Sequence, residues 1–505
     1  MSELWELGIA ETARMIARKQ VSPVDVVDHF LARATALNST LHCFTTIEDD
    51  LARVDARKAE AEIMEGQYKG PLHGIPYSVK DIIDVSGLPT TNNSRLTLGD
   101  VATSDASVVA RLRAAGAILL GKTETQEFAM GGPDFSLPFG PARNPWDLDR
   151  FTGGSSSGSA AAVAAGTVPL AIGTDTGGSI RTPSAYCGIA GMKPTYGRVS
   201  RRGMTPQAYS METAGPMTWC VDDNAIALQA LSGHDPRDSS SVDIPSQPWT
   251  EATSLGVCGM RIGLLRSFHE EEPSSFSDEC VAVFEEAARL FEDAGATTTD
   301  VSLSPLRYYF AAQRVIMYSE AAAVHEDDFR RNLHLYGAYS VERFLPGFLL
   351  TATDYLQACR RRGELTTELA EAFSSVDLLL VIGALGVAPL IRDVAKNSLV
   401  NGTPSVNAAF NLTGSPAMSV PAGFGADGLP LSVQIVGRNF DEFSIYRAAQ
   451  VIEDGMGCRA IRSQASRQGL GRPDGDEIGP WLRDIRQPNK SSEAAGSLSD
   501  GARSF

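Results

Sequence analysis

Two segments rich in glycine and serine carry the residues of this chain that are best suited to chemistry. The first segment is 153–158, with Ser155, and the second is 177–181, with Ser179. Glycine lets a backbone turn through positive φ and present bare N–H groups. A serine hydroxyl beside such donors meets the needs of covalent acyl transfer, because the donors stabilise a developing oxyanion. No histidine lies in or near either segment, so we expect a different base to activate the serine.

Ser179 is the first candidate nucleophile. It follows an apolar, strand-like run at 168–172 and a glycine-rich turn at 173–178. Losing one oxyanion donor typically costs about 3 kcal/mol of barrier. On this segment alone, an ordinary glycine turn before a helix explains the residues equally well. The turn would leave four backbone N–H groups free and convergent, those of Thr176, Gly177, Gly178 and Ser179.

Lys80 is the candidate base. It ends an apolar run at 75–79 that reads as a buried strand, which is an unusual place for an ammonium group. Burial disfavours the charged form and can lower a lysine pKa from about 10.4 by several units. A lysine that is neutral near pH 7 is a competent general base. Taken alone, such a lysine more often reaches the surface or pairs with a neighbour, here Asp81.

Ser155 precedes a helix of small residues at 159–165, against which the backbone can pack closely. A plain flexible loop explains this segment better when it is considered alone. Residues 154–158 also fit the GxSxG pattern, which would make Ser156 the nucleophile of an α/β-hydrolase. We discount that interpretation, because no oxyanion motif follows and the downstream histidines lie in polar or helical surroundings.

Composition argues against several classes of partner. The chain has 505 residues, 43% of them hydrophobic, and a net charge of −17. Nucleic acids and anionic membranes are bound by clustered Lys and Arg, so we expect neither partner. The apolar run at 378–391 is too short and too interrupted by Gly and Pro to span a membrane, and no signal peptide is apparent. The seven scattered cysteines fit free thiols in a reducing cytosol, so we expect a cytoplasmic protein.

Periodicity indicates the elements that must position these residues. Residues 1–65 read as helices of the main domain, with Ser22 as an N-cap. From 66 to 460, short β-branched runs alternate with helical stretches, as in an α/β sheet packed between helices. Residues 461–505 are rich in Gly, Ser, Arg and Asp, and we expect a polar, partly disordered tail. No sharp linker divides the core, so we expect one large domain.

Two histidines beside acidic runs could suggest a metal site, at 269–272 and at 325–328. Neither run has HExxH or paired-cysteine spacing. We interpret both as solvated surface, and we expect neither a metal nor a cofactor.

Taken together, these segments resemble the amidase signature family of serine hydrolases. The resemblance extends from residue 4 to about 453, and the spacing of Lys80, Ser155 and Ser179 also resembles that of the family. A coincidence on this scale would be exceptional, so the simpler interpretations of the three residues lose their force. The other matching segments are 121–131, 143–146, 188–198, 411–414 and 434–438.

The resemblance implies a role for each candidate. Ser179 matches the acyl-forming nucleophile of the family, Ser155 its cis-serine relay and Lys80 its general base. Neutral Lys80 would accept a proton from Ser179 through Ser155 and later return it to the departing nitrogen. The resemblance also assigns the oxyanion hole to the backbone amides of Thr176, Gly177, Gly178 and Ser179.

The same resemblance implies an α/β fold: a single large domain with a mixed, mostly parallel β-sheet flanked by helices on both faces. Within it we expect Ser156 to support the relay by hydrogen bonding. Asp175 and Arg181 are expected to hold the nucleophile loop in place. All three are therefore interpreted as supporting residues.

The family leaves the substrate open. Residues 131–138 differ from the Ser-Ser-Thr-Glu-Asn run that is usual in the glutamine-hydrolysing subunit of a tRNA-dependent amidotransferase, and 354–362 look more like free-standing amidases. The run at 381–389 is apolar here, and Phe135, Leu137 and Phe139 could line the entrance. We therefore expect a small apolar or aryl-bearing amide, or a carbamate or ester, which would make the enzyme a urethanase or esterase as well.

Substrate contacts are expected from Met130, Gly131, Gly132 and Phe135, and the assembly is expected to be a monomer or homodimer. The glutamine-hydrolysing amidotransferase component remains the alternative. A scaffold protein on an inactive amidase fold is a third interpretation, and the presence of all three catalytic side chains argues against it.

Overall fold

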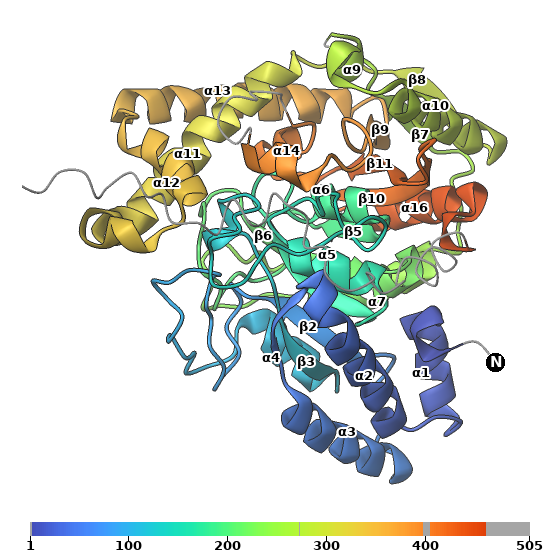
Figure 1. The fold of residues 1–505 in the computed structure, drawn as a ribbon. Helices are drawn as coiled ribbons and strands as arrows, with labels where there is room; N and C mark the ends of the chain where they lie inside the picture. The colour runs from blue at the N-terminus through green and yellow to red at the C-terminus, as the bar shows by residue number, and fades with distance from the viewer. Residues whose placement is uncertain (1–2, 272, 397–404, 461–505) are drawn as a thin grey trace, which may run out of the picture. The chain divides into compact units, whose positions relative to one another are not determined.

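The computed structural model describes residues 3–271, 273–396 and 405–460 (Figure 1). Within these ranges, eleven strands form one sheet in the order β1-β3-β2-β4-β6-β5-β10-β11-β9-β7-β8. The strands are β1 (Phe44–Ile47), β2 (Pro76–Lys80), β3 (Ile118–Thr123), β4 (Leu170–Asp175), β5 (Ala190–Lys193), β6 (Thr213–Thr218), β7 (Arg261–Leu264), β8 (Thr297–Asp300), β9 (Leu378–Ile382), β10 (Ala417–Phe424) and β11 (Pro430–Gly437).

The helices surround this sheet. Ser22 caps the second helix as expected, since its side chain accepts a hydrogen bond from the Val24 N–H at 2.9 Å. The helices are α1 (Ile9–Ala17), α2 (Pro23–Leu41), α3 (Asp49–Met64), α4 (Ser107–Ala114), α5 (Ser157–Ala164), α6 (Arg181–Cys187), α7 (Val221–Leu231), α8 (Trp249–Ala252), α9 (Ser267–Glu270), α10 (Asp278–Asp293), α11 (Leu306–Asn332), α12 (Ala338–Phe344), α13 (Ala352–Ala372), α14 (Ile391–Lys396), α15 (Ala408–Leu412) and α16 (Glu442–Met456).

The sheet is mixed, and the expectation that it is mostly parallel is wrong. Parallel pairing occurs at β2–β3, β2–β4, β7–β8 and β7–β9. The other neighbouring strands pair antiparallel, including the whole central run from β4 through β11 to β9. Parallel neighbours need a crossover, such as α4 between β2 and β3. In contrast, β10 and β11 are joined by a loop of only five residues, 425–429, so the chain returns directly.

Two groups of helices pack on the sheet. Helix α16 contacts both α7 and α10. Of these three helices, α7 packs on β6, α10 on β9 and β11, and α16 on β10 and β11. Helices α5 and α6 contact each other, α5 packing on β4 and α6 on β5 and β10. Every residue of α5 is buried, which fits its small Ser, Gly and Ala side chains. The α/β architecture with one large described domain is therefore confirmed.

The N-terminal segment is less uniformly helical than its sequence suggests. Helices α1, α2 and α3 are present, but 44–47 forms β1, which pairs antiparallel with β3 at one end of the sheet. The run Phe-Thr-Thr-Ile there favours a strand, because aromatic and β-branched residues suit the pleated surface. The expected tail at 461–505 lies outside the described residues.

Helices α11, α12 and α13 form a helical layer that appears at the upper left of Figure 1, and α11 packs on both α12 and α13. His325 of α11 lies inside this layer, in ring contact with Phe128, Tyr336 and Phe344. His325 is 4% exposed and His269 is 6% exposed, so the expectation that both belong to solvated surface is wrong. Neighbouring aromatic rings bury the two imidazoles, while Glu270, Glu271 and residues 326–328 are exposed.

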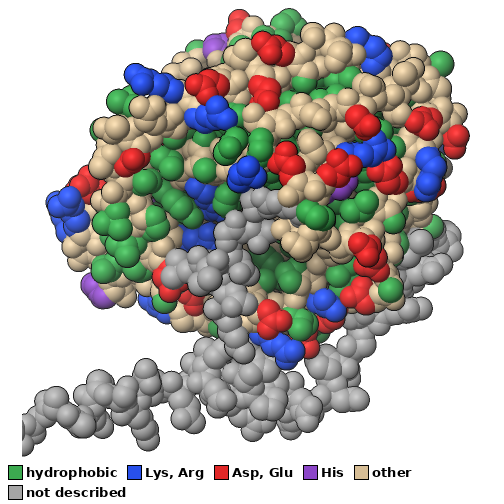
Figure 2. Space-filling model, turned by 90° about the horizontal axis from the view of Figure 1, so that it is seen from above, with side chains coloured by type: hydrophobic (Ala, Val, Ile, Leu, Met, Phe, Trp, Pro, Cys, Tyr) green, Lys and Arg blue, Asp and Glu red, His purple; other side chains and the backbone are tan. Residues whose placement is uncertain are grey.

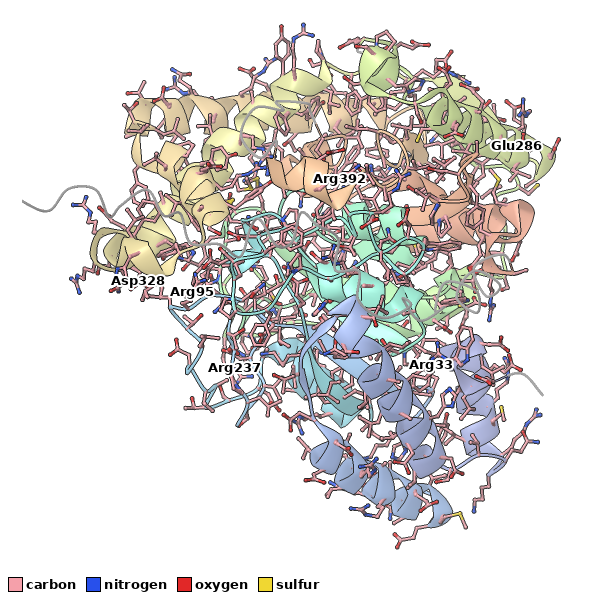
Figure 3. All side chains as sticks on the ribbon, in the orientation of Figure 1. Arg33, Arg95, Arg237, Glu286, Asp328 and Arg392 are labelled. Carbon is pink, nitrogen blue, oxygen red and sulfur yellow. The ribbon has the colours of Figure 1, made fainter. Side chains whose placement is uncertain are left out.

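Charged side chains are distributed over the surface. On the face seen in Figure 2, acidic and basic side chains are interspersed among apolar and uncharged ones. Figure 3 shows Arg237, Glu286 and Asp328 at the periphery of the molecule, and all three are exposed. No helix in the described ranges combines the length and the apolar character needed to cross a bilayer.

Candidate active site

The two serine segments and Lys80 meet where β2 and β4 end. These strands are parallel neighbours, so their carboxyl ends lie at the same edge of the sheet. Lys80 is the last residue of β2, and Asp175 is the last residue of β4. Ser155 directly precedes the segment that leads into α5, and Ser179 precedes α6. The topology thus gathers residues that are far apart in the sequence.

Lys80 is fully buried and bonded to hydroxyl groups. Its Nζ lies 2.7 Å from the Ser155 Oγ and 3.0 Å from the Thr174 Oγ1. Burial lowers the pKa of Lys80 to about 7, although nearby carboxylates, of which Glu212 contributes most, oppose that shift. The alternative pairing with Asp81 is not seen, because Asp81 forms an ion pair with Lys122 at 2.9 Å. Lys80 therefore has the environment of a neutral amine near pH 7.

Ser155 and Ser179 line the same cavity. The Gly154–Ser155 peptide bond is cis, and the Ser155 carbonyl accepts a hydrogen bond from the Gln126 N–H at 3.2 Å. The Ser156 N–H donates to the Ser179 carbonyl at 3.2 Å, which ties the two serine segments together. Within the described residues, no hydrogen bond directly joins the two hydroxyl groups of Ser155 and Ser179.

Ser156 is fully buried and faces β4 instead of the cavity. Its Oγ donates to the Thr174 carbonyl at 3.2 Å and lies 3.3 Å from the Thr174 N–H. This contact fixes the start of α5 beside β4, one residue before the carboxylate of Asp175. A hydroxyl held in this way has no access to a substrate, so Ser156 fits the supporting role expected for it.

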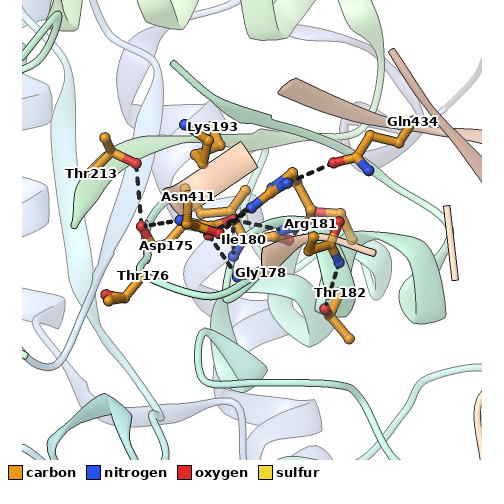
Figure 4. Close-up of polar contacts among 12 residues, drawn as sticks. Asp175, Thr176, Gly178, Ile180, Arg181, Thr182, Lys193, Thr213, Asn411 and Gln434 are labelled. Carbon is orange, nitrogen blue, oxygen red and sulfur yellow. Dashed lines mark hydrogen bonds and ion pairs between the residues drawn. The ribbon is translucent and has the colours of Figure 1, made fainter. Parts of the chain in front are cut away.

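Asp175 and Arg181 form a buried ion pair beneath the Ser179 turn (Figure 4). The Arg181 Nε and Nη2 donate to the two carboxylate oxygens, each at 3.0 Å. The Arg181 Nη1 donates to the Gln434 Oε1 at 2.6 Å, and the Asn411 Nδ2 donates to Asp175 at 2.8 Å. Burial would raise the pKa of Asp175, but the charge and hydrogen bonds of Arg181 hold it well below its ordinary value.

The Asp175 carboxylate also changes the set of oxyanion donors. Its Oδ1 accepts the Gly178 N–H at 2.7 Å, so this amide is not free for the role predicted for it. The carboxylate turns back toward the loop because Arg181 holds it there. The N–H groups of Thr176, Gly177 and Ser179 have no acceptor among the described residues, so three of the four expected donors are available.

A cavity of about 190 Å³ opens beside the two serines. Three of the four predicted contact residues, Met130, Gly131 and Gly132, line it. Phe135 is not among the lining residues, and its ring packs against the Arg143 guanidinium at 5.2 Å. The cavity wall also contains polar residues that were not predicted from the sequence, namely Gln126, Gln207, Gln313, Arg314, Tyr339 and Arg343.

Part of this polar lining follows the periodicity of a helix, which is visible in the sequence. Phe310, Gln313, Arg314 and Met317 are spaced as one face of a helix, and all four line the cavity from α11. The spacing alone does not show which neighbour that face meets. Only the packing of α11 near the Ser179 turn, where Gln313 donates to the Thr176 carbonyl at 3.2 Å, decides this.

Comparison with known proteins now decides the family. Residues 25–445 match the family model described as Amidase. The chain belongs to the amidase signature family. Members of the family act on carbon–nitrogen bonds, so this amidase is an enzyme of that class, and the resemblance drawn from its sequence is confirmed.

Relatives and solved structures cover nearly the whole amidase. It is 37% identical over 479 residues to a subunit of the glutamyl-tRNA(Gln) amidotransferase of Chloroflexus aurantiacus, covering 90% of this chain and 97% of the relative. A structure from a vestigial complex that bears on the origins of an s-triazine catabolic enzyme is 32% identical, with a TM-score of 0.81 over 89% of this chain and 98% of the other. A bacterial aryl acylamidase is 27% identical, with a TM-score of 0.80 over 92% and 99%.

Proposed function

We propose that this amidase cleaves the C–N bond of a small linear amide through an acyl-enzyme on Ser179. The observation that carries the proposal is the 2.7 Å contact between the Lys80 Nζ and the Ser155 Oγ beside the Ser179 turn. A buried lysine surrounded by hydroxyl groups can act as a base, and a serine held against it can pass a proton on. Lys80 is then the general base, Ser155 the relay and Ser179 the nucleophile.

In the acylation step, the Ser179 Oγ attacks the amide carbonyl carbon. The proton of Ser179 passes to Ser155, whose own proton moves to Lys80. The tetrahedral intermediate then collapses, the C–N bond breaks, and the same relay delivers the proton to the departing nitrogen. Water repeats the sequence on the ester, which releases the acid and restores Ser179.

Within the described residues, no hydrogen bond joins the Ser155 and Ser179 hydroxyl groups, so the proposed relay requires the Ser179 side chain to move toward Ser155. Ser179 is half-buried and lies at the cavity wall, while the Ser155 Oγ is held by Lys80. Catalytic hydrogen bonds often tighten only when substrate is bound. A change in the Ser179 side-chain rotamer toward Ser155 completes the path, because the two segments are already joined by the Ser156 N–H.

The negative oxygen of the intermediate is stabilised by backbone donors. The N–H groups of Thr176, Gly177 and Ser179 are free for this purpose, whereas Asp175 occupies that of Gly178. Each such donor lowers the barrier by about 3 kcal/mol. Asp175 and Arg181 act as positioning residues here, because they fix the turn without touching the substrate.

The substrate that we favour is a small amide. An aryl-bearing substrate was expected from the apolar run at 381–389 together with Phe135, Leu137 and Phe139. None of these residues lines the cavity, and the Phe135 ring packs on Arg143. The cavity wall combines apolar Phe310 and Met317 with the polar Gln313 and Arg314. A small polar amide therefore fits better than an aryl amide, and cleavage of carbamates by the same attack remains part of the proposal.

The second candidate is the glutamine-hydrolysing subunit of a tRNA-dependent amidotransferase. It is favoured by the name of the relatives that are 35–37% identical over about nine-tenths of the chain. In that case the amidase would act within a complex and pass ammonia to a partner. All seven cysteines are free thiols, which is compatible with the cytoplasmic setting that we propose for either activity.

A labelling and hydrolysis experiment on the purified full chain tests the proposal. We expect a fluorophosphonate probe to attach to Ser179, and ammonia release from small amides without ATP or a partner. Ser179→Ala should lose both the label and the activity, while Ser254→Ala, at an exposed surface serine, should keep both. A label on any residue other than Ser179 would contradict the proposal. Activity on glutamine that requires added partner proteins would favour the second candidate.

A further inference from the structure

We infer that the substrate of this amidase carries a carboxylate, which Arg314 and Arg343 bind within the catalytic cavity. The inference rests on the proposed function for Ser179 and names the class of amide that the site takes. Arg314 lies on α11 and Arg343 on α12, and both line the cavity that contains Ser155 and Ser179. The substrate is then a monoamide of a small dicarboxylic acid.

Arg314 lies close to the reacting centre. Its neighbour Gln313 donates to the Thr176 carbonyl at 3.2 Å, so this face of α11 begins directly beside the Ser179 turn. The guanidinium of Arg314 lies 4.7 Å from the Phe310 ring centroid, and its Nη1 donates to the Tyr318 hydroxyl at 3.2 Å. These contacts leave several of its five N–H donors unused.

Arg343 reaches the same cavity from α12. Its guanidinium lies 5.7 Å from the centroid of the Tyr339 ring, which also lines the cavity. The Arg343 Nε is buried and has no hydrogen-bond partner among the described residues. Buried donors are nearly always satisfied in folded proteins, so an unpaired guanidinium N–H indicates that a bound molecule completes the site.

Neither arginine has a counter-charge. Within the described ranges, neither Arg314 nor Arg343 forms an ion pair with an Asp or Glu, whereas the buried Arg181 and Arg198 each pair with a carboxylate. Burial lowers the pKa of Arg314 and the positive charge of Arg343 adds to this, although Tyr318 opposes the shift. Burial also acts to lower the pKa of Arg343, but Tyr318 and Tyr339 raise it overall. Two like charges in one half-buried site are costly unless an anion joins them. The planar fork of a guanidinium matches the two oxygens of a carboxylate.

The same lining disfavours an ammonium group on the substrate. No Asp or Glu belongs to the described cavity wall. Residues 397–404, outside the described ranges, contain no acidic residue in the sequence. The α-ammonium of glutamine would therefore lie near two guanidinium groups without a carboxylate to pair with it. Glutaramate, which is glutamine without its amino group, fits the charges better.

The competing explanation is that the arginines only support the α11–α12 packing by stacking on aromatic rings. Stacking accounts for the contacts with Phe310 and Tyr339. It does not account for the absence of a carboxylate partner, nor for the unpaired Arg343 Nε. The two explanations differ in what they predict for neutral substrates, so they can be separated.

The first arm of the experiment compares substrates on the full-length chain. Malonamate, succinamate and glutaramate are assayed for ammonia release beside their methyl esters and beside glutamine. We expect kcat/KM for the best acid amide to exceed that for its methyl ester, and that for glutamine, by about 10- to 100-fold. Equal rates for acid amide and ester would overturn the inference, and so would faster turnover of glutamine.

The second arm compares variants. Arg343→Met and Arg314→Met should each raise KM for the acid amide so that kcat/KM falls about 10- to 100-fold, with little change for the methyl ester. Arg331→Met is the matched control, because this exposed residue lies on α11 away from the cavity and should behave like wild type. Equal losses on both substrates would assign the arginines to packing and overturn the inference. Fluorophosphonate labelling of Ser179 in each variant separates that result from a failure of the proposed function.

Discussion

At the residue scale, the environment decides what each buried lysine can do. Lys80 and Lys122 lie at the carboxyl end of neighbouring strands, and both are fully buried. Lys122 pairs with the carboxylate of Asp81 at 2.9 Å, whereas the hydrogen bonds of the Lys80 Nζ within the described part of the chain go to hydroxyl groups. A carboxylate stabilises an ammonium ion, while burial among hydroxyl groups favours the neutral amine. These neighbours support the role of base that we propose for Lys80. The pKa of buried Lys193 is also lowered to about 7, but Lys193 does not line the cavity with the two serines.

Replacing Lys80 tests this assignment directly. We expect Lys80→Met to lower kcat by about 10²–10⁴-fold, because the proton of Ser179 then has no acceptor. Lys58→Met, at an exposed position on α3, is the matched control and should retain full activity. Steady-state kinetics at pH 8 provide the measurement. Wild-type turnover by the Lys80 variant would show that another group acts as the base.

The pH dependence of kcat/KM follows from the same lysine. Since burial lowers the pKa of Lys80 to about 7, activity should fall tenfold per pH unit below that value as the amine becomes protonated. The Glu212 carboxylate opposes this shift, so Glu212→Gln should move the acid limb of the profile to lower pH. Glu286→Gln on the exposed face of α10 should leave the limb in place. A shift to higher pH in the Glu212 variant would contradict this electrostatic account.

At the element scale, a single ion pair connects β4 to α6. Asp175 ends the strand and Arg181 begins the helix, and both are fully buried. Asp175 also accepts hydrogen bonds from the Gly178 and Ile180 N–H groups at 2.7 and 3.1 Å. One carboxylate therefore holds the turn that carries Ser179, and the N–H groups of Thr176, Gly177 and Ser179 remain for the oxyanion role that we propose.

Breaking this pair should destabilise the fold more than breaking an exposed one. Arg181→Met leaves the Asp175 charge buried without its partner, which costs about 3–5 kcal/mol. Arg261→Met, which breaks the exposed pair of Arg261 with Asp377, should cost less than about 1 kcal/mol. Urea unfolding followed by circular dichroism measures both. Similar losses in the two variants would mean that the buried network contributes little.

His325 should make the helical layer of α11, α12 and α13 sensitive to acid. Burial lowers the pKa of His325 to about 4, below its ordinary value of 6.5. The unfolded chain takes up the proton first, so the stabilisation is complete above pH 6.5 and is lost as the pH falls toward 4. His325→Phe should reduce this loss by on the order of 2 kcal/mol. Melting curves recorded from pH 7 to pH 4 measure this loss of stability. His334→Phe, at an exposed histidine, is the matched control. The same dependence of melting temperature on pH in both variants would exclude a role for His325.

At the scale of the whole molecule, one eleven-stranded sheet runs through the described residues, and the candidate site lies nearer one of its ends. The part with β2 and β4 carries the proposed catalytic residues, while β7, β8 and β9 lie toward the other end, where α10 packs on β8 and β9. Helix α11 contributes the polar wall of the cavity from outside the sheet. The proposed base and the wall of the cavity therefore come from different elements, β2 and α11.

The sequence predicts that residues 461–505 are a tail outside the core. A chain that ends at residue 460 should then keep its melting temperature within about 2 °C and its kcat/KM within about twofold of the full chain. A deletion that also removes α16 (Glu442–Met456) is the contrasting variant and should fail to fold, since α16 packs on β10 and β11. Loss of activity on removing 461–505 alone would show that the tail belongs to the functional protein.

Sequence patterns were enough to predict the family, the α/β class and the three candidate catalytic residues. These signals are local or fixed in spacing: glycine turns that carry serine, and a lysine at the end of an apolar strand. The residues predicted to contact substrate were only partly correct. Met130, Gly131 and Gly132 line the cavity, whereas Phe135 does not. Local pattern shows that a residue is near a turn, but not which way its side chain packs.

The strand directions, the unpaired N–H groups of the Ser179 turn and the charge of the cavity became clear only from the folded chain. Strand direction depends on pairing between distant segments, and the loss of the Gly178 donor depends on a carboxylate that Arg181 holds from beneath. The cationic wall depends on α11 and α12, which lie far along the chain from Ser179. Such features arise from long-range packing, which no window of the sequence contains.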